Sequence, residues 1–374
     1  MEKQHSYKRY QRQMILKEFG VRGQQKLQDA KVLVLGAGGL GCPALQYLGG
    51  AGIGTIGIVD DDVVSLTNLH RQVLFSTTDI GHSKALQAQH YLQSLNDEII
   101  VEAFNERLGV HNALQIFSRY DIILDGSDNF ATRYLVNDAC VLLDKPFVYG
   151  AVSQFEGQVG ILNVINLVGQ PAVNYRDLFP HPPQESEVLN CAEGGVLGPL
   201  PGIIGTMQAN EVIKFICGLG KPLVHSMLTF NALTNQVYTI DLTAREGSRS
   251  LIPADKAAFE KMDYAWLCGI KSPQQEIHYD QFKSLIDNSK VTIIDVREME
   301  EVSLVNAFVH QKIPLSSMRK EVPAIADDTI VVFCQTGKRS MQAAQLLFDR
   351  FGTSKKIYSL HGGIENWAQH QEIT

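Results

Sequence analysis

The chain has 374 residues, of which 45% are hydrophobic, and a formal net charge of −7 at pH 7. This length exceeds the roughly 100–200 residues of one ordinary domain, so we expect two domains. The acidic balance, without a basic block, argues against a nucleic-acid partner. The first fifteen residues are polar and charged, and the apolar stretch 32–59 is interrupted by glycines. We therefore expect no signal peptide and no membrane span, and we place the protein in the cytoplasm.

Strands and helices are expected to alternate through the first half of the chain. The predicted strands are 31–35, 55–60, 99–104, 121–125 and 147–149, and the predicted helices are 40–48, 85–95 and 131–143. This alternation implies right-handed crossovers and a parallel sheet covered on both faces. Two later strands, 158–164 and 236–242, are expected to be antiparallel.

The second half begins with an irregular stretch, 173–200, that contains four prolines. A connection of this length is usually functional or disordered. The spacing then predicts a helix over 203–216, and residues 244–275 are typical of a linker. A smaller α/β unit follows, with strands 291–295 and 330–333 and a helix over 341–348.

A glycine-rich motif follows the first predicted strand. Gly36-Ala37-Gly38-Gly39-Leu40-Gly41 fits G-x-G-x-x-G, and the missing side chains let phosphate oxygens approach the N–H groups at a helix start. Asp60 ends the next strand, at the spacing of an acid that binds a ribose hydroxyl. A nicotinamide dehydrogenase would show the same features, so this motif predicts a nucleotide site without choosing the nucleotide.

Charged and amide side chains gather in the segments after these strands: Asp62, Asn68, Arg71, Lys84, Asp128 and Asn129. Two cations and spare carboxylates suit a triphosphate with a magnesium ion, whose charge must be neutralised as pyrophosphate leaves. Dinucleotide redox chemistry does not need them. We therefore favour ATP with Mg²⁺, and an NAD-dependent oxidoreductase is the alternative.

These motifs resemble the MoeB/ThiF family of ubiquitin-activating-type adenylyltransferases. The resemblance covers about residues 5–242 and rests on Arg9-Tyr10-x-Arg12-Gln13, the glycine motif, Asp60-x-Asp62, Thr67-Asn68-Leu69-His70-Arg71-Gln72 and Asp125-x-x-Asp128-Asn129. It implies a Rossmann-like, mostly parallel sheet with helices on both faces. It also implies adenylation of the C-terminal Gly-Gly carboxylate of a ubiquitin-like sulfur carrier of the ThiS/MoaD type.

The resemblance also assigns residues. It implies nucleotide contacts by Gly36, Gly38, Gly39, Gly41, Asp60, Asp62, Thr67, Asn68, Leu69, His70, Arg71, Lys84, Asp128 and Asn129. Asp60 would hold the ribose, Arg71 and Lys84 the phosphates, and Asp128 the magnesium ion. Arg12 matches an arginine that reaches into the neighbouring subunit's site, which implies a homodimer.

No structural zinc is expected. Many family members bind zinc through two C-x-x-C pairs, but the corresponding stretches here, about 174–183 and 241–249, contain no cysteine. The chain has six cysteines and no C-x-x-C pair, and its eleven histidines do not cluster at the spacing of metal ligands.

Two of the cysteines are candidates for chemistry. Cys191 precedes the glycine-rich segment 192–199, which is typical of a flexible connection. In relatives that combine activation with sulfur transfer, the matching cysteine is assigned an acyl- or persulfide-linked intermediate, and the resemblance implies the same for Cys191. The alternative is an incidental thiol.

Cys334 follows the apolar strand 330–333 and opens a loop made of Gln335, Thr336, Gly337, Lys338, Arg339 and Ser340. Backbone N–H groups, a helix dipole and the two cations of this loop are expected to favour the thiolate, which attacks a sulfur donor and then carries a persulfide. Only four residues separate Cys334 from Arg339, one fewer than in C-x-x-x-x-x-R phosphatases, so phosphatase activity is disfavoured.

With Asp295-Val296-Arg297-Glu298 and His361-Gly362-Gly363-Ile364-x-x-Trp367, this loop resembles a rhodanese domain over about residues 276–374. The segment 300–314 lacks the Gly-His-Ile-x-Gly-Ala pattern common in rhodaneses. We expect three parts: an adenylyltransferase domain at 1–243, a linker at 244–275 and a smaller α/β rhodanese-like domain at 276–374.

Together the two resemblances predict an enzyme that adenylates a sulfur carrier and converts it to a thiocarboxylate with sulfur from Cys334. The donor would be a cysteine desulfurase or thiosulfate, and the product would serve thiamine, molybdopterin or tRNA thiolation. A carrier-binding scaffold without catalysis is the alternative.

Overall fold

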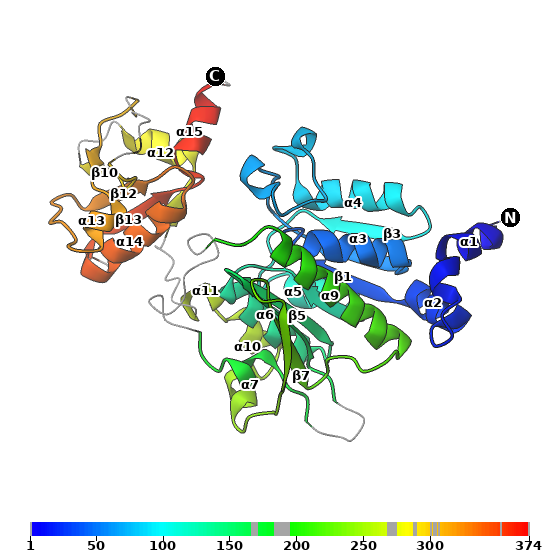
Figure 1. Cartoon of the computed structure of the whole chain (residues 1–374). Coiled ribbons are helices and arrows are strands. Elements are labelled where there is room, and N and C mark those ends of the chain that lie inside the picture. The colour runs from blue at the N-terminus through cyan, green and yellow to red at the C-terminus, as the bar shows by residue number, and fades with distance from the viewer. Residues whose placement is uncertain are drawn as a thin grey trace. The chain divides into compact units, whose positions relative to one another are not determined.

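The computed structural model describes residues 2–165, 171–182, 195–267, 275–286, 290–299, 301, 305, 307–351 and 354–372. The chain forms two compact units, Met1–Tyr264 and Ala265–Thr374 (Figure 1). The boundary therefore falls inside the linker expected at 244–275. The segment before it packs on the first unit: the 3₁₀-helix η3 (Ser248–Leu251) contacts α7 (Tyr175–Leu178), and α10 (Lys256–Glu260) contacts α6.

The first unit is built on an eight-stranded sheet in the order β3-β2-β1-β4-β5-β6-β7-β8. The strands are β1 (Lys31–Leu35), β2 (Thr55–Val59), β3 (Ile100–Phe104), β4 (Ile122–Asp125), β5 (Phe147–Ser153), β6 (Glu156–Leu162), β7 (Ser226–Asn231) and β8 (Gln236–Asp241). Strands β1 to β5 are parallel, and β6 to β8 are antiparallel. The two antiparallel strands predicted from the sequence are confirmed, whereas β7 was not predicted.

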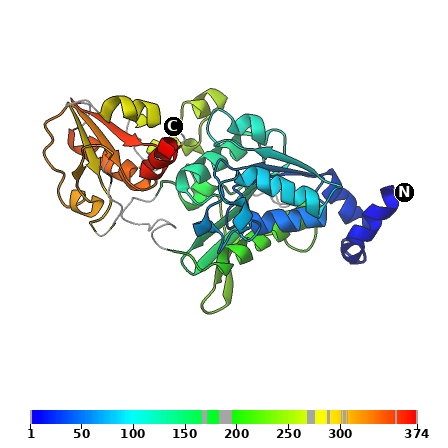
Figure 2. The ribbon, with the colours of Figure 1, turned by 90° about the horizontal axis from the view of Figure 1, so that it is seen from above.

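Helices cover both faces of this sheet. The helices α3 (Gly41–Ala51), α4 (Lys84–Leu95) and α9 (Pro199–Cys217) pack together on one face, and α5 (Ala113–Phe117) and α6 (Phe130–Leu142) pack together on the other (Figure 2). Because crossovers are right-handed, the helices change face where the strand order reverses, between β3 and β4. The chain therefore leaves β1 and β4 toward opposite faces, which opens a crevice at their carboxyl ends.

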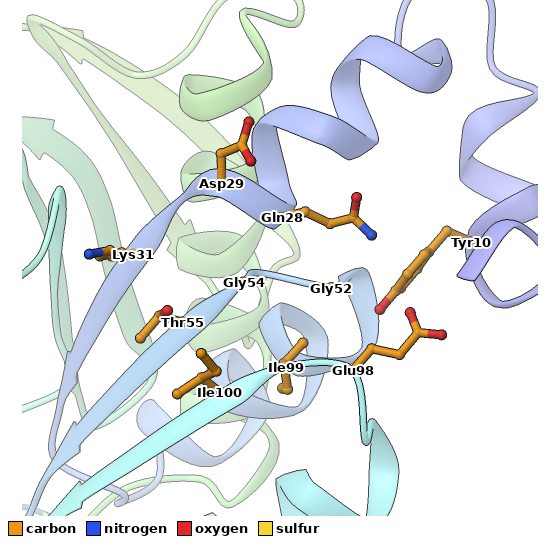
Figure 3. A pocket seen from close by; sticks show the side chains of 10 residues that line it. All are labelled: Tyr10, Gln28, Asp29, Lys31, Gly52, Gly54, Thr55, Glu98, Ile99 and Ile100. Atoms are coloured by element: carbon orange, nitrogen blue, oxygen red, sulfur yellow. The ribbon is translucent and has the colours of Figure 1, made fainter. Parts of the chain in front are cut away.

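Two amino-terminal helices that the sequence analysis missed, α1 (Glu2–Met14) and α2 (Gly20–Asp29), lie at the amino ends of the strands. Tyr10 of α1 is buried, its hydroxyl accepts a hydrogen bond from Asn96 Nδ2 at 2.8 Å, and its ring lies so close to Gly52 that an added Cβ would be 2.5 Å from Cζ. A shallow pocket of about 330 Å³ lies beside Tyr10, lined by residues that precede or begin β1, β2 and β3 (Figure 3). This is the sheet edge opposite to the glycine motif.

A buried ion pair fixes the end of the first unit. Arg176 donates to both carboxylate oxygens of Asp138, through Nε at 2.8 Å and Nη2 at 2.6 Å, and both side chains are at most 2% exposed. Tyr264 adds a hydrogen bond from its hydroxyl to Asp138 Oδ2 at 2.8 Å. Residues far apart in the chain are thus joined on α6 without contact with water.

The second unit has a five-stranded, entirely parallel sheet in the order β11-β10-β12-β13-β9. Its strands are β9 (Gln275–Ile277), β10 (Val291–Asp295), β11 (Gln311–Lys312), β12 (Thr329–Phe333) and β13 (Lys356–Leu360), and its helices are α12 (Tyr279–Ile286), α13 (Leu315–Met318), α14 (Lys338–Phe351) and α15 (Gly363–Glu372). Because strand side chains alternate, Val331 and Phe333 pack with Trp367 on one face, and Val332 and Cys334 pack with Leu347 on the other. The predicted fold class, two α/β units of which the second is smaller, is confirmed.

We expect Arg176→Met to lower the free energy of unfolding of the first unit by about 3–5 kcal/mol, because it leaves the Asp138 carboxylate buried without its cation. Urea unfolding followed by circular dichroism measures the change. Lys256→Met is the matched control, because Lys256 forms an exposed pair with Glu260 at 3.6 Å, and its loss should cost less than about 1 kcal/mol. Equal losses in the two variants would contradict a stabilising role for the buried pair.

Candidate active sites

The glycine motif forms a tight turn between β1 and α3. Gly36 has φ +85° and donates its N–H to Val59 O at 2.8 Å, which ties the turn to β2. A Cβ added to Gly41 would lie 1.8 Å from Gly36 O, closer than any side chain allows. The turn therefore requires glycine at position 41, and it leaves the first N–H groups of α3 facing the crevice.

Asp60 connects the end of β2 to the glycine motif. Its Oδ2 accepts from Ala37 N at 2.7 Å, and its Oδ1 accepts from Asp62 N at 2.8 Å. Burial raises the pKa of Asp60 above its ordinary value, although the Lys84 charge and these two N–H groups act against the rise. Each oxygen retains a lone pair, so the carboxylate can accept a further hydrogen bond.

The two predicted phosphate-binding cations lie in this region. Lys84 begins α4, is 4% exposed and donates to Asp62 Oδ2 at 2.9 Å. Arg71 lies over the glycine motif, with its Cδ 3.6 Å from the place of a Cβ on Gly39, and donates to Thr67 O at 3.2 Å.

The segment from Thr67 to His70 builds the turn that carries Arg71. It consists of the 3₁₀-helix η1 (Leu66–Asn68) followed by Leu69 and His70. The carbonyl of Asn68 accepts from the N–H groups of Arg71 and Gln72, and Leu69 packs on the core. These residues position Arg71 through backbone contacts.

The crevice wall on the other side follows β4. The Gly126 carbonyl lies 3.1 Å from the place of a Cβ on Gly36, so the two loops touch. Asp125 is fully buried, and its Oδ1 accepts from Ser127 N at 2.9 Å. Burial raises its pKa, opposed by the Arg133 charge. Asp128 is exposed on this loop, and Asn129 caps α6 by accepting from Thr132 N at 2.9 Å.

Several buried polar atoms near these loops have no hydrogen-bond partner in the described part of the chain, among them Gln72 Oε1, Asp125 Oδ2 and Ser127 Oγ. Gln72 lies beside the glycine motif, with Nε2 3.7 Å from the place of a Cβ on Gly38. Buried polar atoms are normally paired, so this set suits a polar ligand in the crevice. Together with the cations and the glycine turn, it fits ATP with its magnesium ion.

One predicted site residue, Arg12, is not brought to this crevice. It is exposed on α1, whose Tyr10 is anchored at the opposite edge of the sheet. Cys191 lies outside the described residues. Pro201 of α9 forms part of the crevice rim, because its Cβ lies 3.0 Å from the place of a Cβ on Gly39.

The two stretches that correspond to zinc-binding segments in the family are joined by hydrogen bonds. Asp177 Oδ1 accepts from Arg245 N at 2.7 Å and from Ser248 Oγ at 2.5 Å. Asn174 caps α7 at the same place. Over the described ranges, no group of three or more His, Cys, Asp or Glu side chains is arranged to hold a metal ion.

The second candidate site is the loop between β12 and α14. Cys334 is 1% exposed and lies at the base of this loop. Its carbonyl accepts from Ile364 N at 2.9 Å, and the carbonyl of Gln335 accepts from Glu365 N at 3.1 Å. Gly363 has φ +64°, and a Cβ there would lie 2.5 Å from Cys334 O. The motif predicted around residues 361–364 therefore holds the loop through its backbone.

The two cations of this loop have different surroundings. Arg339 forms a forked ion pair with Glu301, with Nη2 2.8 Å from Oε2 and Nη1 bonded to Oε1. Lys338 is exposed at the start of α14. The expectation that these two cations act on the sulfur did not include Glu301. It follows the Asp295–Glu298 motif closely in sequence, but its partner lies 38 residues away.

A second arginine, Arg297, is buried behind the loop. It donates to both oxygens of Asp295 and to Gln335 Oε1 at 3.3 Å. Burial alone would raise the pKa of Asp295, but the hydrogen bonds and charge of Arg297 outweigh it and the pKa is lowered. The Asp295 carboxylate therefore stays ionised at neutral pH, and Arg297 fixes the Gln335 side chain.

The sequence model of the ThiF family matches residues 10–250, which is more than half of the chain, and that of the rhodanese-like domain matches residues 278–370. The chain belongs to the ThiF family. Its second unit is a rhodanese-like domain.

Two of three similar proteins carry both activities in their names, and the third carries the first activity alone. This ThiF-family chain is 40% identical to the probable adenylyltransferase/sulfurtransferase MoeZ of Mycobacterium tuberculosis, over 97% of the chain and 93% of the relative. It is 48% identical to the sulfur carrier protein adenylyltransferase of Thermus thermophilus, over 70% of the chain and 97% of the relative. It is 38% identical to the adenylyltransferase and sulfurtransferase MOCS3 of Culex quinquefasciatus, over 97% and 87%.

Solved structures support the fold of the first unit. The structure of E. coli MccB with ATP superposes with a TM-score of 0.54 at 24% identity and covers 64% of this chain and 72% of that one. The predicted enzyme class, an adenylyltransferase with a sulfurtransferase part, is confirmed by the relatives, and they give no support to an oxidoreductase. None of the described helices is long and apolar enough to cross a bilayer.

We expect Gly41→Ala to weaken ATP binding by roughly 100-fold, the equivalent of about 3 kcal/mol, because its methyl group collides with Gly36 O and must push the turn apart. Titration calorimetry with ATP measures the loss. Gly50→Ala is the matched control on the same helix, since a Cβ there meets nothing within 4 Å. A Gly41→Ala chain that binds ATP as the parent does would show that the turn is not the nucleotide cradle.

Proposed function

We propose that this chain adenylates the C-terminal Gly-Gly carboxylate of a ubiquitin-like sulfur-carrier protein and then supplies the sulfur that makes it a thiocarboxylate. The observation that carries the proposal is one chain with both an anion-binding crevice at β1 and β4 and a loop that presents Cys334. Relatives whose names combine the two activities support it. The setting we propose is the cytoplasm, and the product would serve thiamine, molybdopterin or tRNA thiolation.

In the first reaction the carrier carboxylate attacks the α-phosphorus of ATP, the bond to the β-phosphate breaks, and pyrophosphate leaves. The carboxylate is already ionised, so positioning and charge stabilisation supply most of the catalysis. The N–H groups of the glycine motif would hold the phosphates and Asp60 the ribose. Bound Mg²⁺, held by Asp128, would neutralise phosphate charge.

Arg71 and Lys84 would act on the charge that develops on the leaving pyrophosphate. Lys84 already donates to Asp62, whose side chain is 74% exposed. Asp62 can therefore turn toward water or the metal ion when the phosphates take the ammonium group.

In the second reaction Cys334 takes one sulfur from a cysteine desulfurase or thiosulfate as a persulfide. The terminal sulfur of the persulfide attacks the acyl adenylate, AMP leaves with the electron pair of the broken acyl–oxygen bond, and the carrier is joined to Cys334 as an acyl disulfide. We propose Cys191 as the linking thiol: its thiolate attacks the Cys334 sulfur, the S–S bond breaks, and the thiocarboxylate leaves with the electron pair. The disulfide that remains between the two cysteines is reduced by an external thiol.

The parent chain should catalyse exchange of labelled pyrophosphate into ATP only when a Gly-Gly carrier is present. Cys334→Ala should spare this exchange, because Cys334 takes no part in adenylation, and should abolish thiocarboxylate formation, read in the carrier's mass as the replacement of one oxygen by sulfur. Asp128→Asn should instead slow the exchange itself at least tenfold, about 1.4 kcal/mol. A chain that binds the carrier with no exchange would be a scaffold, contrary to the proposal.

We also propose a homodimer in which Arg12 completes the neighbouring site. The position of α1 supports this proposal. Because α1 lies at the sheet edge opposite to the glycine motif, Arg12 does not reach the crevice of its own subunit. A self-complementary pair of subunits would exchange the arginine symmetrically.

Arg12→Ala and Arg71→Ala should each abolish pyrophosphate exchange alone. After co-refolding in equal amounts, about one quarter of the parent's activity should return, because a mixed dimer holds one site with both arginines. Analytical ultracentrifugation checks that each variant remains a dimer. No recovery from a mixture that demonstrably forms mixed dimers would place Arg12 outside the neighbouring site.

A further inference from the structure

The arginine of the Cys334 loop is already paired with an acid. Arg339 gives two parallel hydrogen bonds to the Glu301 carboxylate, a geometry in which the two charges largely cancel. The pair is only partly covered, with side-chain exposures of 33% and 34%, so a sulfur donor can reach it. The pKa of Arg339 is raised by this hydrogen bond first and also by the Cys334 thiol, so the guanidinium faces both groups.

Glu301 is held in place independently of Arg339. Its Oε1 accepts from Glu298 N at 2.9 Å, and its own N–H donates to Glu298 O at 3.2 Å. The Glu298 carboxylate is anchored in turn by Ser316 Oγ at 2.6 Å. The hydrogen bond from Arg339 lowers the pKa of Glu301 to about 2, so the negative charge persists at neutral pH. Glu301 is a fixed element of the site.

Other polar groups of the loop are engaged too. Arg297 is bound to Asp295, and the Gln335 amide donates to Glu365 Oε1 at 3.0 Å. Each arginine near the sulfur thus has its own carboxylate, and the exposed Lys338 adds a positive charge at the start of α14. The loop has the shape of an anion-binding turn but little net positive charge.

We propose that Glu301 is a specificity-determining residue for the sulfur donor, because its pairing with Arg339 disfavours dianionic donors such as thiosulfate and favours uncharged alkyl hydropersulfides. The inference rests on the proposed role of Cys334 as sulfur acceptor. Glu301 is not a catalytic residue, since it acts on the donor through Arg339.

The charges of the two reactions differ. With thiosulfate, the Cys334 thiolate attacks the outer sulfur, the S–S bond breaks, and sulfite leaves with the electron pair, so three negative charges meet in the transition state. An alkyl hydropersulfide reacts in its protonated, uncharged form: the thiolate takes the terminal sulfur with its proton, an alkyl thiolate leaves, and one negative charge is present. Without the Glu301 charge, Arg339 is no longer neutralised and stabilises the two additional negative charges of the thiosulfate transition state. At the effective dielectric of a protein surface, this raises the rate of the thiosulfate reaction at least about tenfold.

The test measures sulfur loading of Cys334 in the full-length chain by intact-protein mass spectrometry. One donor is thiosulfate, and the other is the uncharged hydropersulfide of N-acetylcysteine methyl ester. In Glu301→Gln, which keeps an acceptor for Glu298 N, the ratio of the thiosulfate rate to the hydropersulfide rate should rise at least about tenfold over the parent. Replacing Arg339 as well, in Glu301→Gln/Arg339→Gln, should remove the gain, because the freed cation is its cause.

Asp328→Asn is the matched control. It removes the same charge from the same unit, but Asp328 precedes β12 and lies roughly 20 Å along the strand from Cys334, beyond the screening length of about 8 Å. Its ratio should equal the parent's. Glu301→Ala removes the same charge without introducing an amide, so the result does not depend on the folding of a single variant. Cys334→Ala measures sulfur that is loaded on cysteines other than Cys334.

The outcomes separate the inference from the proposed function. A parent chain loaded by neither donor would refute the role of Cys334 and the inference with it. Loading with an unchanged ratio in both Glu301 variants would overturn the inference alone. A ratio that rises equally in Asp328→Asn would show a general charge effect, which also overturns it.

Discussion

The first unit depends on close backbone approach at the end of β1. A Cβ on Gly41 would lie 1.8 Å from Gly36 O, and a Cβ on Gly205 of α9 would lie 2.1 Å from Leu40 O. These two contacts bring α3 back over β1 and α9 down onto α3. The tight turn at Gly36 also contacts Gly126, which follows β4. This one set of glycine contacts determines the position of the crevice. It also positions the helix ends that face the crevice and the rim at Pro201.

Each candidate site holds one cation in a pair with an acid. Lys84 is bound to Asp62 and Arg339 to Glu301, because a covered cation without a partner would cost several kcal/mol. An anionic ligand must therefore compete with a carboxylate that is already present. The position and mobility of the acid consequently determine which anion binds. Asp62 is 74% exposed and can move aside, whereas Glu301 is tied into the turn with Glu298.

The sequence predicted the parts of the fold that local pattern determines. The strand, glycine turn and helix over 31–51 and the alternation through β5 follow from apolar runs and glycine positions. The helix α1 was missed because it is strongly polar, and among its described side chains Tyr10 alone is fully buried. In the sites, the residues of the glycine turn and Cys334 could be predicted from motifs. The pairing of Glu301 with Arg339 could not be predicted from the sequence. These residues follow β10 and β12, which are neighbours in the sheet, and no local spacing in the sequence gives the order of strands.

The size and the charge of the Cys334 loop both disfavour the binding of a tetrahedral oxyanion. With four residues between Cys334 and Arg339, the loop is shorter than a phosphatase loop and encloses a smaller ring. Hydrogen bonds from the N–H groups of Ile364 and Glu365 to the carbonyls of Cys334 and Gln335 hold the backbone of this ring in place. A tetrahedral oxyanion needs both a wider ring and uncompensated positive charge. The ring of this loop is smaller, and Glu301 occupies the guanidinium of Arg339, which leaves the exposed Lys338 as the remaining cation of the loop. A single sulfur atom needs only room beside the thiolate, so the same two features that disfavour oxyanions are compatible with a persulfide.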